Sequence, residues 1–239
     1  MWGSRLTREP PENVPEHVPV LAIDGPSGSG KGTIAQAIAN RLGWHRLDSG
    51  ALYRAVGLAA GMRGISDDDD EGLAQMTMEL DLQFNSGNGT ETVQLDGEDV
   101  TDAIRSEQAS RAASRVAAKP AVRRALLARQ HGFATPPGLV ADGRDMGTVV
   151  FPDASLKVFL TASAEERARR RHKQLKDKGI DVSLRDLSQG IAERDQRDQA
   201  REVAPLKPAD NARLLDSTDL SPDEVTQQIL QWLECEGIK

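Results

Sequence analysis

The fold of this protein is decided by a stretch near the start of the chain, which reads Val18-Pro19-Val20-Leu21-Ala22-Ile23-Asp24-Gly25-Pro26-Ser27-Gly28-Ser29-Gly30-Lys31-Gly32-Thr33. Its apolar beginning, residues 18–23, predicts a short buried strand that ends at a glycine-rich turn. Apolar residues then recur at helical spacing until Gly43 stops the helix (Ile34, Ala35, Ile38, Ala39 and Leu42). A strand, a loop and a helix in this order predict the first half of a βαβ unit.

The glycine-rich turn has the spacing of a phosphate-binding P-loop. Gly25 is followed after four residues by Gly30 and Lys31, between a predicted strand and a predicted helix, as the motif requires. Glycines let successive N–H groups point at one anion, and Lys31 can reach the β- and γ-phosphates. The residues expected to bind ATP are Gly25, Pro26, Ser27, Gly28, Ser29, Gly30, Lys31, Gly32 and Thr33.

One position departs from the usual P-loop. Gly32 stands where the motif ordinarily has Ser or Thr, and Thr33 follows one place later. The hydroxyl of the Ser or Thr that Gly32 replaces is the usual Mg²⁺ ligand of the loop. We therefore expect Mg²⁺ to act together with ATP, and the sequence assigns no residue to the metal directly.

Composition excludes several classes of protein. The 239 residues are 38% hydrophobic, enough for a core, and the single cysteine, Cys235, permits no intrachain disulfide. No apolar stretch approaches the length of a membrane span, and residues 1–19 lack an apolar signal core. A net charge of −7 and only 3% aromatic residues argue against a nucleic-acid polymer as partner. We expect a cytoplasmic enzyme with no membrane partner.

Charge and periodicity divide the chain. Residues 1–17 are polar and proline-rich, which predicts a disordered tail. The stretch 66–100 holds eleven acidic residues and no basic one, so it contributes −11 and the remainder +4. Alternation in 80–84 and 92–95 predicts a β-hairpin in an inserted subdomain. The aspartate run 67–70 is interpreted as a solvated helix start rather than a metal site.

Further strands and helices predicted along the chain indicate an α/β fold class. We expect a parallel sheet of the P-loop NTPase type, flanked by helices. Strands are predicted over 138–141, 156–160 and 212–216. Ser49 is predicted to be the N-cap of a second helix. Capping boxes are predicted at residues 163–166 and 221–224, the second with Pro222 at the first helical position.

Triphosphate binding leaves the type of activity open. A GTPase would need the guanine-reading sequence Asn-Lys-x-Asp, which is absent, and a motor or helicase would need further motifs. A kinase of a small substrate needs many arginines to neutralise charge, and residues 165–201 hold eleven Lys/Arg against eight Asp/Glu. Several activities therefore stay open. The protein could be a kinase of a small acceptor, with UMP and shikimate among the possible acceptors, or a regulatory P-loop ATPase or binding module.

Four segments resemble the bacterial cytidylate kinases: residues 24–33, 47–54, 141–152 and 193–198. The run Asp-Gly-Arg-Asp-Met-Gly-Thr-Val-Val-Phe-Pro, residues 142–152, is specific to that branch of the nucleoside monophosphate kinases. The resemblance extends from about Val18 to the C-terminus. It implies transfer of the γ-phosphate of ATP to CMP or dCMP, with Mg²⁺.

The resemblance also implies a division of the chain into parts. The core would comprise residues 18–62, 120–163 and 204–239. An insert that binds the nucleoside monophosphate would span about 63–119, and a mobile helical lid about 164–203. We expect the enzyme to be a monomer.

For the acceptor base, the resemblance implies that Asp145 accepts from N4 of cytosine while Arg123 donates to N3 or O2, with Ser114 nearby. A carboxylate and a guanidinium match these groups chemically. Two other interpretations stay open. Asp145 could simply cap the following turn, and periodicity alone favours Arg123 as a solvated helix arginine.

For the acceptor phosphate, the resemblance implies a fork of Arg54 and Arg144, each able to bind phosphate bidentately. Ser49 could cap its helix and still face the ligand. Asp48 would lie near the transferred group, in a role toward either a metal-bound water or the ribose. The loop 216–218 would lie near adenine, or form only a turn.

The lid is expected to contribute Arg194, Asp198 and Arg201, which share one helix face at i, i+4 and i+7. The resemblance implies that Asp198 holds the CMP sugar and that the arginines reach phosphates on closure. The implied catalytic residues are Lys31, Arg144, Asp48 and Arg194. The implied CMP-binding residues are Ser49, Arg54, Ser114, Arg123, Arg144, Asp145, Arg194, Asp198 and Arg201.

Overall fold

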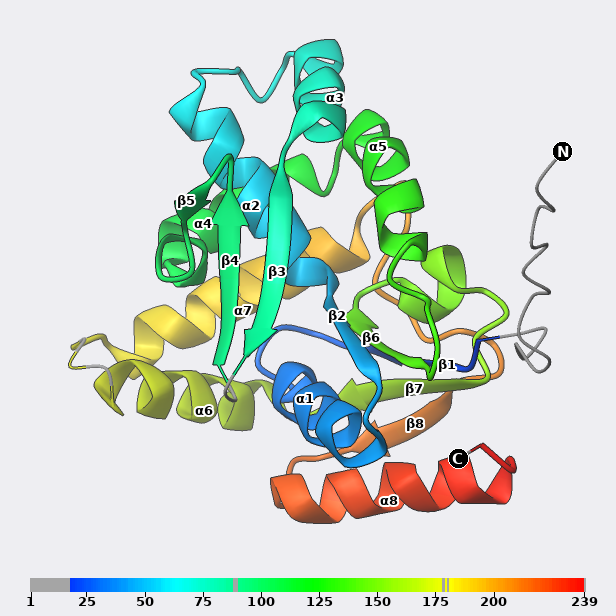
Figure 1. Ribbon diagram of the computed structural model, residues 1–239. Coiled ribbons are helices and arrows are strands. Elements are labelled where there is room, and N and C mark those ends of the chain that lie inside the picture. Colours follow the sequence, from blue (N-terminus) through cyan, green and yellow to red (C-terminus); the bar gives the residue numbers. More distant parts are fainter. Residues whose placement is uncertain (1–17, 88–89, 178, 180, 239) are drawn as a thin grey trace, which may run out of the picture.

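The computed structural model describes residues 18–87, 90–177, 179 and 181–238 (Figure 1). The tail predicted to be disordered, residues 1–17, lies outside this range. Within it, no helix is long and apolar enough to cross a membrane.

A five-stranded parallel sheet forms the centre of the molecule, with the order β2-β6-β1-β7-β8 (Figure 1). The strand that leads into the P-loop, β1, is the central one. The strands are β1 (Val20–Asp24), β2 (His45–Asp48), β6 (Leu139–Gly143), β7 (Leu156–Thr161) and β8 (Arg213–Asp216). The predicted fold class and each predicted core strand are therefore confirmed, with ends shifted by one or two residues.

Helices cover both faces of this sheet because successive side chains of a strand point in opposite directions. Leu21 and Ile23 pack with α1 (Lys31–Leu42) and α8 (Pro222–Cys235) in one core. Val20 and Ala22 pack in a second core on the other face. That core is built by α2 (Ser49–Met62), α5 (Pro120–His131) and the inserted subdomain.

The insert between α2 and α5 is a small three-stranded antiparallel sheet with helices at either end (Figure 1). Its elements are α3 (Asp70–Glu79), β3 (Leu82–Gly87), β4 (Thr90–Leu95), β5 (Glu98–Asp99), η1 (Ala103–Arg105) and α4 (Glu107–Val116). The predicted hairpin is confirmed, although residues 88 and 89 of its turn lie outside the described residues. The short third strand, β5, was not predicted.

The aspartate run starts a helix, as expected. The Asp69 carboxylate accepts a hydrogen bond from the backbone N–H of Gly72 at 2.9 Å and so caps α3. Asp67 also pairs with Arg115 at 2.5 Å, and Asp70 with Lys119 at 2.9 Å. Part of the negative charge of the insert is therefore balanced by cations near its C-terminal end.

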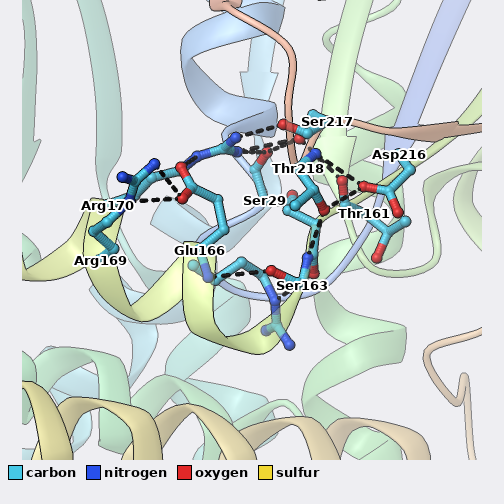
Figure 2. Close-up of polar contacts among 11 residues, drawn as sticks. Ser29, Thr161, Ser163, Glu166, Arg169, Arg170, Asp216, Ser217 and Thr218 are labelled. Carbon is cyan, nitrogen blue, oxygen red and sulfur yellow. Dashed lines mark hydrogen bonds and ion pairs between the residues drawn. The ribbon is translucent and has the colours of Figure 1, made fainter.

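Two helix starts differ from the prediction. Asp48, not Ser49, is the N-cap of α2, because its carboxylate accepts from the backbone N–H of Ala51 at 2.8 Å. The hydroxyl of Ser163 accepts from the N–H of Glu166 at 3.2 Å, which is half of the predicted capping box. The Glu166 carboxylate instead binds two arginines, as Figure 2 shows. The box at Ser221 is complete.

The remaining elements follow β6 and β7. A π-helix, η2 (Met146–Val150), comes directly after the end of β6. Helices α6 (Ala164–Asp177) and α7 (Leu184–Gln199) lie side by side and project from the carboxyl end of the sheet (Figure 1). The arginine-rich segment of the sequence is this helix pair.

The close contact between α2 and α4 leaves no room for a side chain at Gly57, which predicts how substitutions on α2 change stability. A Cβ at Gly57 would lie 2.8 Å from the Cβ of Ala112, whereas Gly61 on the same helix has nothing within 4 Å. We expect Gly57→Ala to lower the free energy of unfolding by about 1–3 kcal/mol through overpacking. Gly61→Ala should raise it by about 0.5–1 kcal/mol through helix propensity. Urea denaturation of both variants measures this, and stabilisation by both would contradict the packing argument.

Candidate active site

The P-loop has the geometry of an anion site. Gly25 has φ +156° and a Cβ there would lie 2.0 Å from the carbonyl oxygen of Leu160, so only glycine fits. Gly30 has φ +91° at the N-cap of α1, and no side chain caps that helix. The N–H groups of its first turn are therefore available to a phosphate.

Lys31 is held inside this loop. Its ammonium donates a hydrogen bond to the carbonyl oxygen of Pro26 at 3.1 Å. Burial first, and the positive charge of Arg144 second, lower the pKa of Lys31 to about 7, while Asp142 acts in the opposite direction. A bound triphosphate would supply the negative charge that this position lacks.

Asp145 and Arg123 form a buried ion pair just past the carboxyl end of β6. Their residue exposures are 2% and 8%, so Arg123 is not the solvated helix arginine that periodicity favours. Its guanidinium also donates to the carbonyl oxygen of Ala117 at 3.1 Å and lies 5.7 Å from the centre of the Tyr53 ring. Asp145 makes no side-chain cap on η2, so the capping alternative is wrong as well.

Two serine hydroxyls behave differently. Ser114, on α4, is buried, and its hydroxyl has no hydrogen-bond partner among the described residues. Ser49 donates its hydroxyl hydrogen to the Oε1 atom of Gln130 at 2.9 Å. Gln130 is 1% exposed, and the sequence offered no signal for it.

Two arginines converge on one carboxylate near the end of α7. Asp198, 1% exposed, accepts from the Nε of Arg144 at 2.9 Å and also pairs with Arg201. The helix α7 ends at Gln199, so the expectation that Arg201 lies on its face at i+7 is wrong. The chain leaves the helix first and still brings the guanidinium back to Asp198.

Arg194 faces the same cluster from α7. Burial first, and the charge of Arg144 second, lower the pKa of Arg194 to about 10, and Asp198 opposes this. Its Nε atom is buried and has no hydrogen-bond partner within the described part of the chain. This arginine is therefore surrounded by too few negative groups for its charge.

Three carboxylates lie at or next to the carboxyl ends of the neighbouring strands β1, β2 and β6. Asp24 accepts from the backbone N–H groups of Met146 and Gly147, each at 2.8 Å, and burial raises its pKa to about 6. Asp48 pairs with Arg54 at 2.9 Å. Burial, and then repulsion from Asp48, raise the pKa of Asp142 to about 6. Ligand sites of α/β proteins lie at such strand ends.

Helix α6 is tied to the P-loop backbone and to α7. Arg167 donates to the carbonyl oxygen of Ser27 at 3.0 Å and to Asp195 on α7 at 2.6 Å. Figure 2 shows Arg170 reaching the carbonyl of Ser29 and both oxygens of Ser217. The sequence signalled only a local density of arginines here.

The loop after β8 is a turn. Asp216 accepts from the backbone N–H of Thr218 at 2.9 Å and from its hydroxyl at 2.5 Å (Figure 2). Both side chains are thus engaged within the loop, in line with the simpler of the two interpretations of residues 216–218. No group of three or more His, Cys, Asp or Glu side chains suited to a metal occurs among the described residues.

A P-loop on the central strand of a parallel sheet, faced by buried arginines from a helical pair, defines the class of P-loop phosphotransferases. The family model for cytidylate kinase matches residues 21–235. The cytidylate kinase of Pseudomonas aeruginosa (strain LESB58) is 59% identical over 222 residues, 92% of this chain and 97% of that protein.

Two further relatives agree. The cytidylate kinase of Stutzerimonas stutzeri is 60% identical over 216 residues, 89% of this chain and 94% of that protein. That of Methylococcus capsulatus is 58% identical over 213 residues, 89% of this chain and 96% of that protein. The chain belongs to the cytidylate kinase family, and the protein is an ATP-dependent phosphotransferase.

The lowered pKa of Lys31 predicts a pH dependence of ATP binding. A triphosphate favours the charged lysine, so binding takes up a proton wherever the pH exceeds the free-state pKa of about 7. We expect ATP affinity to fall between pH 7.5 and 9, by up to about tenfold per pH unit. Isothermal titration in buffers of different ionisation enthalpy measures both effects. Lys31→Arg, which does not titrate in this range, should give a flat profile; an equal slope would refute the assignment.

Proposed function

We propose that this protein transfers the γ-phosphate of ATP to CMP or dCMP, giving ADP and CDP or dCDP. The observation that carries the proposal is the buried ion pair between Asp145 and Arg123, which lies beside Arg144 at the end of β6. Cytosine presents a donor at N4 and acceptors at N3 and O2, which match a carboxylate and a guanidinium. Adenine would be better matched by an amide side chain.

The donor nucleotide is assigned to the P-loop, residues 25–33. Curled backbone, the uncapped start of α1 and Lys31 together provide positive potential for the β- and γ-phosphates. Thr33 is exposed on the first turn of that helix. The ties from Arg167 and Arg170 to the loop support a lid that acts directly over this site.

The acceptor nucleotide is assigned to the opposite side. Asp145 and Arg123 would hold the base, with the hydroxyl of Ser114 available for a further hydrogen bond. Asp198 would hold the sugar. The residues that would contact the acceptor phosphate are Ser49, Arg54, Arg144, Arg194 and Arg201.

Phosphoryl transfer in this site needs positioning and charge neutralisation. An oxygen of the CMP phosphate attacks the γ-phosphorus and ADP leaves; the attacking group is already anionic, so no general base is required. Lys31, Arg144 and Arg194 would neutralise the charge that gathers on the transferred group. Closure of α6 and α7 would exclude water and so prevent hydrolysis of ATP.

The family generally uses Mg²⁺ with ATP, and the carboxylate pair of Asp48 and Asp142 fits such an ion. Register places the two residues opposite one another on β2 and β6. Burial first, and repulsion from Asp48 second, raise the pKa of Asp142, and a cation would relieve the repulsion. Mg²⁺ is typically held by one or two carboxylates together with substrate phosphates. It would polarise the phosphates and reduce their charge.

The division into core, insert (about 63–119) and lid (about 164–203) is part of the proposal. It is supported by the separate antiparallel sheet and by the projecting helix pair. The proposal includes a monomeric enzyme. An exposed free thiol at Cys235 is consistent with work in the cytoplasm.

A comparison of phosphoryl acceptors tests the function. The purified protein is given ATP, Mg²⁺ and CMP, dCMP, UMP or AMP in turn, and the product diphosphate is measured. We expect CMP and dCMP to be preferred. Preference for AMP would contradict the base assignment. Free phosphate without a nucleoside diphosphate would favour the ATPase alternative.

Asp145→Asn tests the base contact. The change keeps the size of the side chain but replaces one acceptor oxygen with a donor, so kcat/KM for CMP should fall by about tenfold or more. The KM for ATP should stay within about twofold of wild type. Exposed Asp153→Asn is the matched control. Equal losses for both nucleotides would show that Asp145 does not read the acceptor.

A further inference from the structure

One arginine, Arg46, lies beside both candidate metal carboxylates, Asp48 and Asp142. Arg46 and Asp48 are two residues apart on β2, so their side chains leave the same face of the sheet. Asp142 is the register partner of Asp48 on β6 and leaves that face too. Arg46 lies between them: its NH2 atom is 3.1 Å from Asp142 and 3.7 Å from Asp48.

Arg46 is also fixed from the helix above. Its NH1 atom donates to the Oε1 atom of Gln36 on α1 at 3.2 Å, and its side chain is 12% exposed. The guanidinium therefore has a defined place beneath the first turn of α1. A charge held this way between two carboxylates is screened little by solvent.

The guanidinium of Arg46 lies beside Gly32 of the P-loop. A Cβ on Gly32 would lie 3.5 Å from the NH2 atom of Arg46 and 3.9 Å from a carboxylate oxygen of Asp142. In the usual P-loop a Ser or Thr hydroxyl projects from this position toward the metal. Here glycine leaves the space open, and a permanent cation stands next to it.

We propose that Arg46 is a built-in counter-ion that competes with the divalent cation for Asp48 and Asp142, and so weakens binding of free Mg²⁺. The inference rests on the proposed metal role of these two carboxylates. In the resting enzyme the guanidinium offsets part of their negative charge. The divalent ion then binds well only when the phosphates of ATP supply the further negative charge, which couples metal binding to nucleotide binding. Arg46 is thus a positioning residue.

Arg46→Met tests the inference, because methionine fills similar space without charge. Binding of Mn²⁺, a paramagnetic substitute for Mg²⁺, is measured by electron paramagnetic resonance on the nucleotide-free protein. We expect affinity to rise by about tenfold or more, and Arg46→Lys to bind more weakly than Arg46→Met. Arg63→Met, which removes an arginine from an exposed pair with Asp96, is the matched control and should not change the affinity.

A second pair of variants separates this inference from the proposed metal residues. Asp142→Asn should weaken Mn²⁺ binding and should cancel the gain when combined with Arg46→Met. Unchanged or weaker Mn²⁺ binding in a folded Arg46→Met protein would overturn the role of Arg46. If Asp142→Asn had no effect in either background, the carboxylates would not be the metal ligands. Should Arg46→Met not fold, Arg46→Gln takes its place, because glutamine also removes the charge but keeps polar atoms; unchanged Mn²⁺ affinity in that variant would overturn the inference.

Discussion

Parallel pairing of β1, β2 and β6 is the constraint on which the rest of this structure depends. Parallel strands end at one edge of the sheet, so three aspartates that are far apart in the sequence finish beside the P-loop. These are Asp24, Asp48 and Asp142. Each carboxylate then organises a different neighbour: the start of η2, the start of α2 together with Arg54, and Arg46.

The arginines around this edge are satisfied by the protein's own carboxylates. Arg123 pairs with Asp145, and Arg144 and Arg201 share Asp198; all three carboxylate–arginine contacts involve a buried carboxylate. Burying a cation without a partner costs several kcal/mol, on the order that breaking a buried pair costs. Internal pairing therefore stabilises this concentration of positive charge. Arg194 and Lys31, whose pKa values are lowered, hold the least compensated charges.

Local patterns predicted a large part of the fold. The P-loop, the helix after it and the capping box at Ser221 follow from residues close together in sequence. Predictions failed, or could not be made, where a side chain's role depends on which other residue it contacts. Ser49 looked like a cap, but Asp48 one residue earlier accepts the bond. The spacing of Arg201 from Arg194 predicted that it lies on the same helix, but α7 ends at Gln199, before Arg201.

The sequence by itself determined the α/β core, the phosphate loop and, through the resemblance, the family. It could do so because backbone curl, helix starts and strand burial are governed by neighbouring residues. Only the tertiary structure decided which charges meet. Arg46 and Asp142 are 96 residues apart, Ser49 and Gln130 81, and Arg167 and Ser27 140. Such pairings follow from how strands and helices pack, because the partners come from different elements and no local spacing encodes their contact.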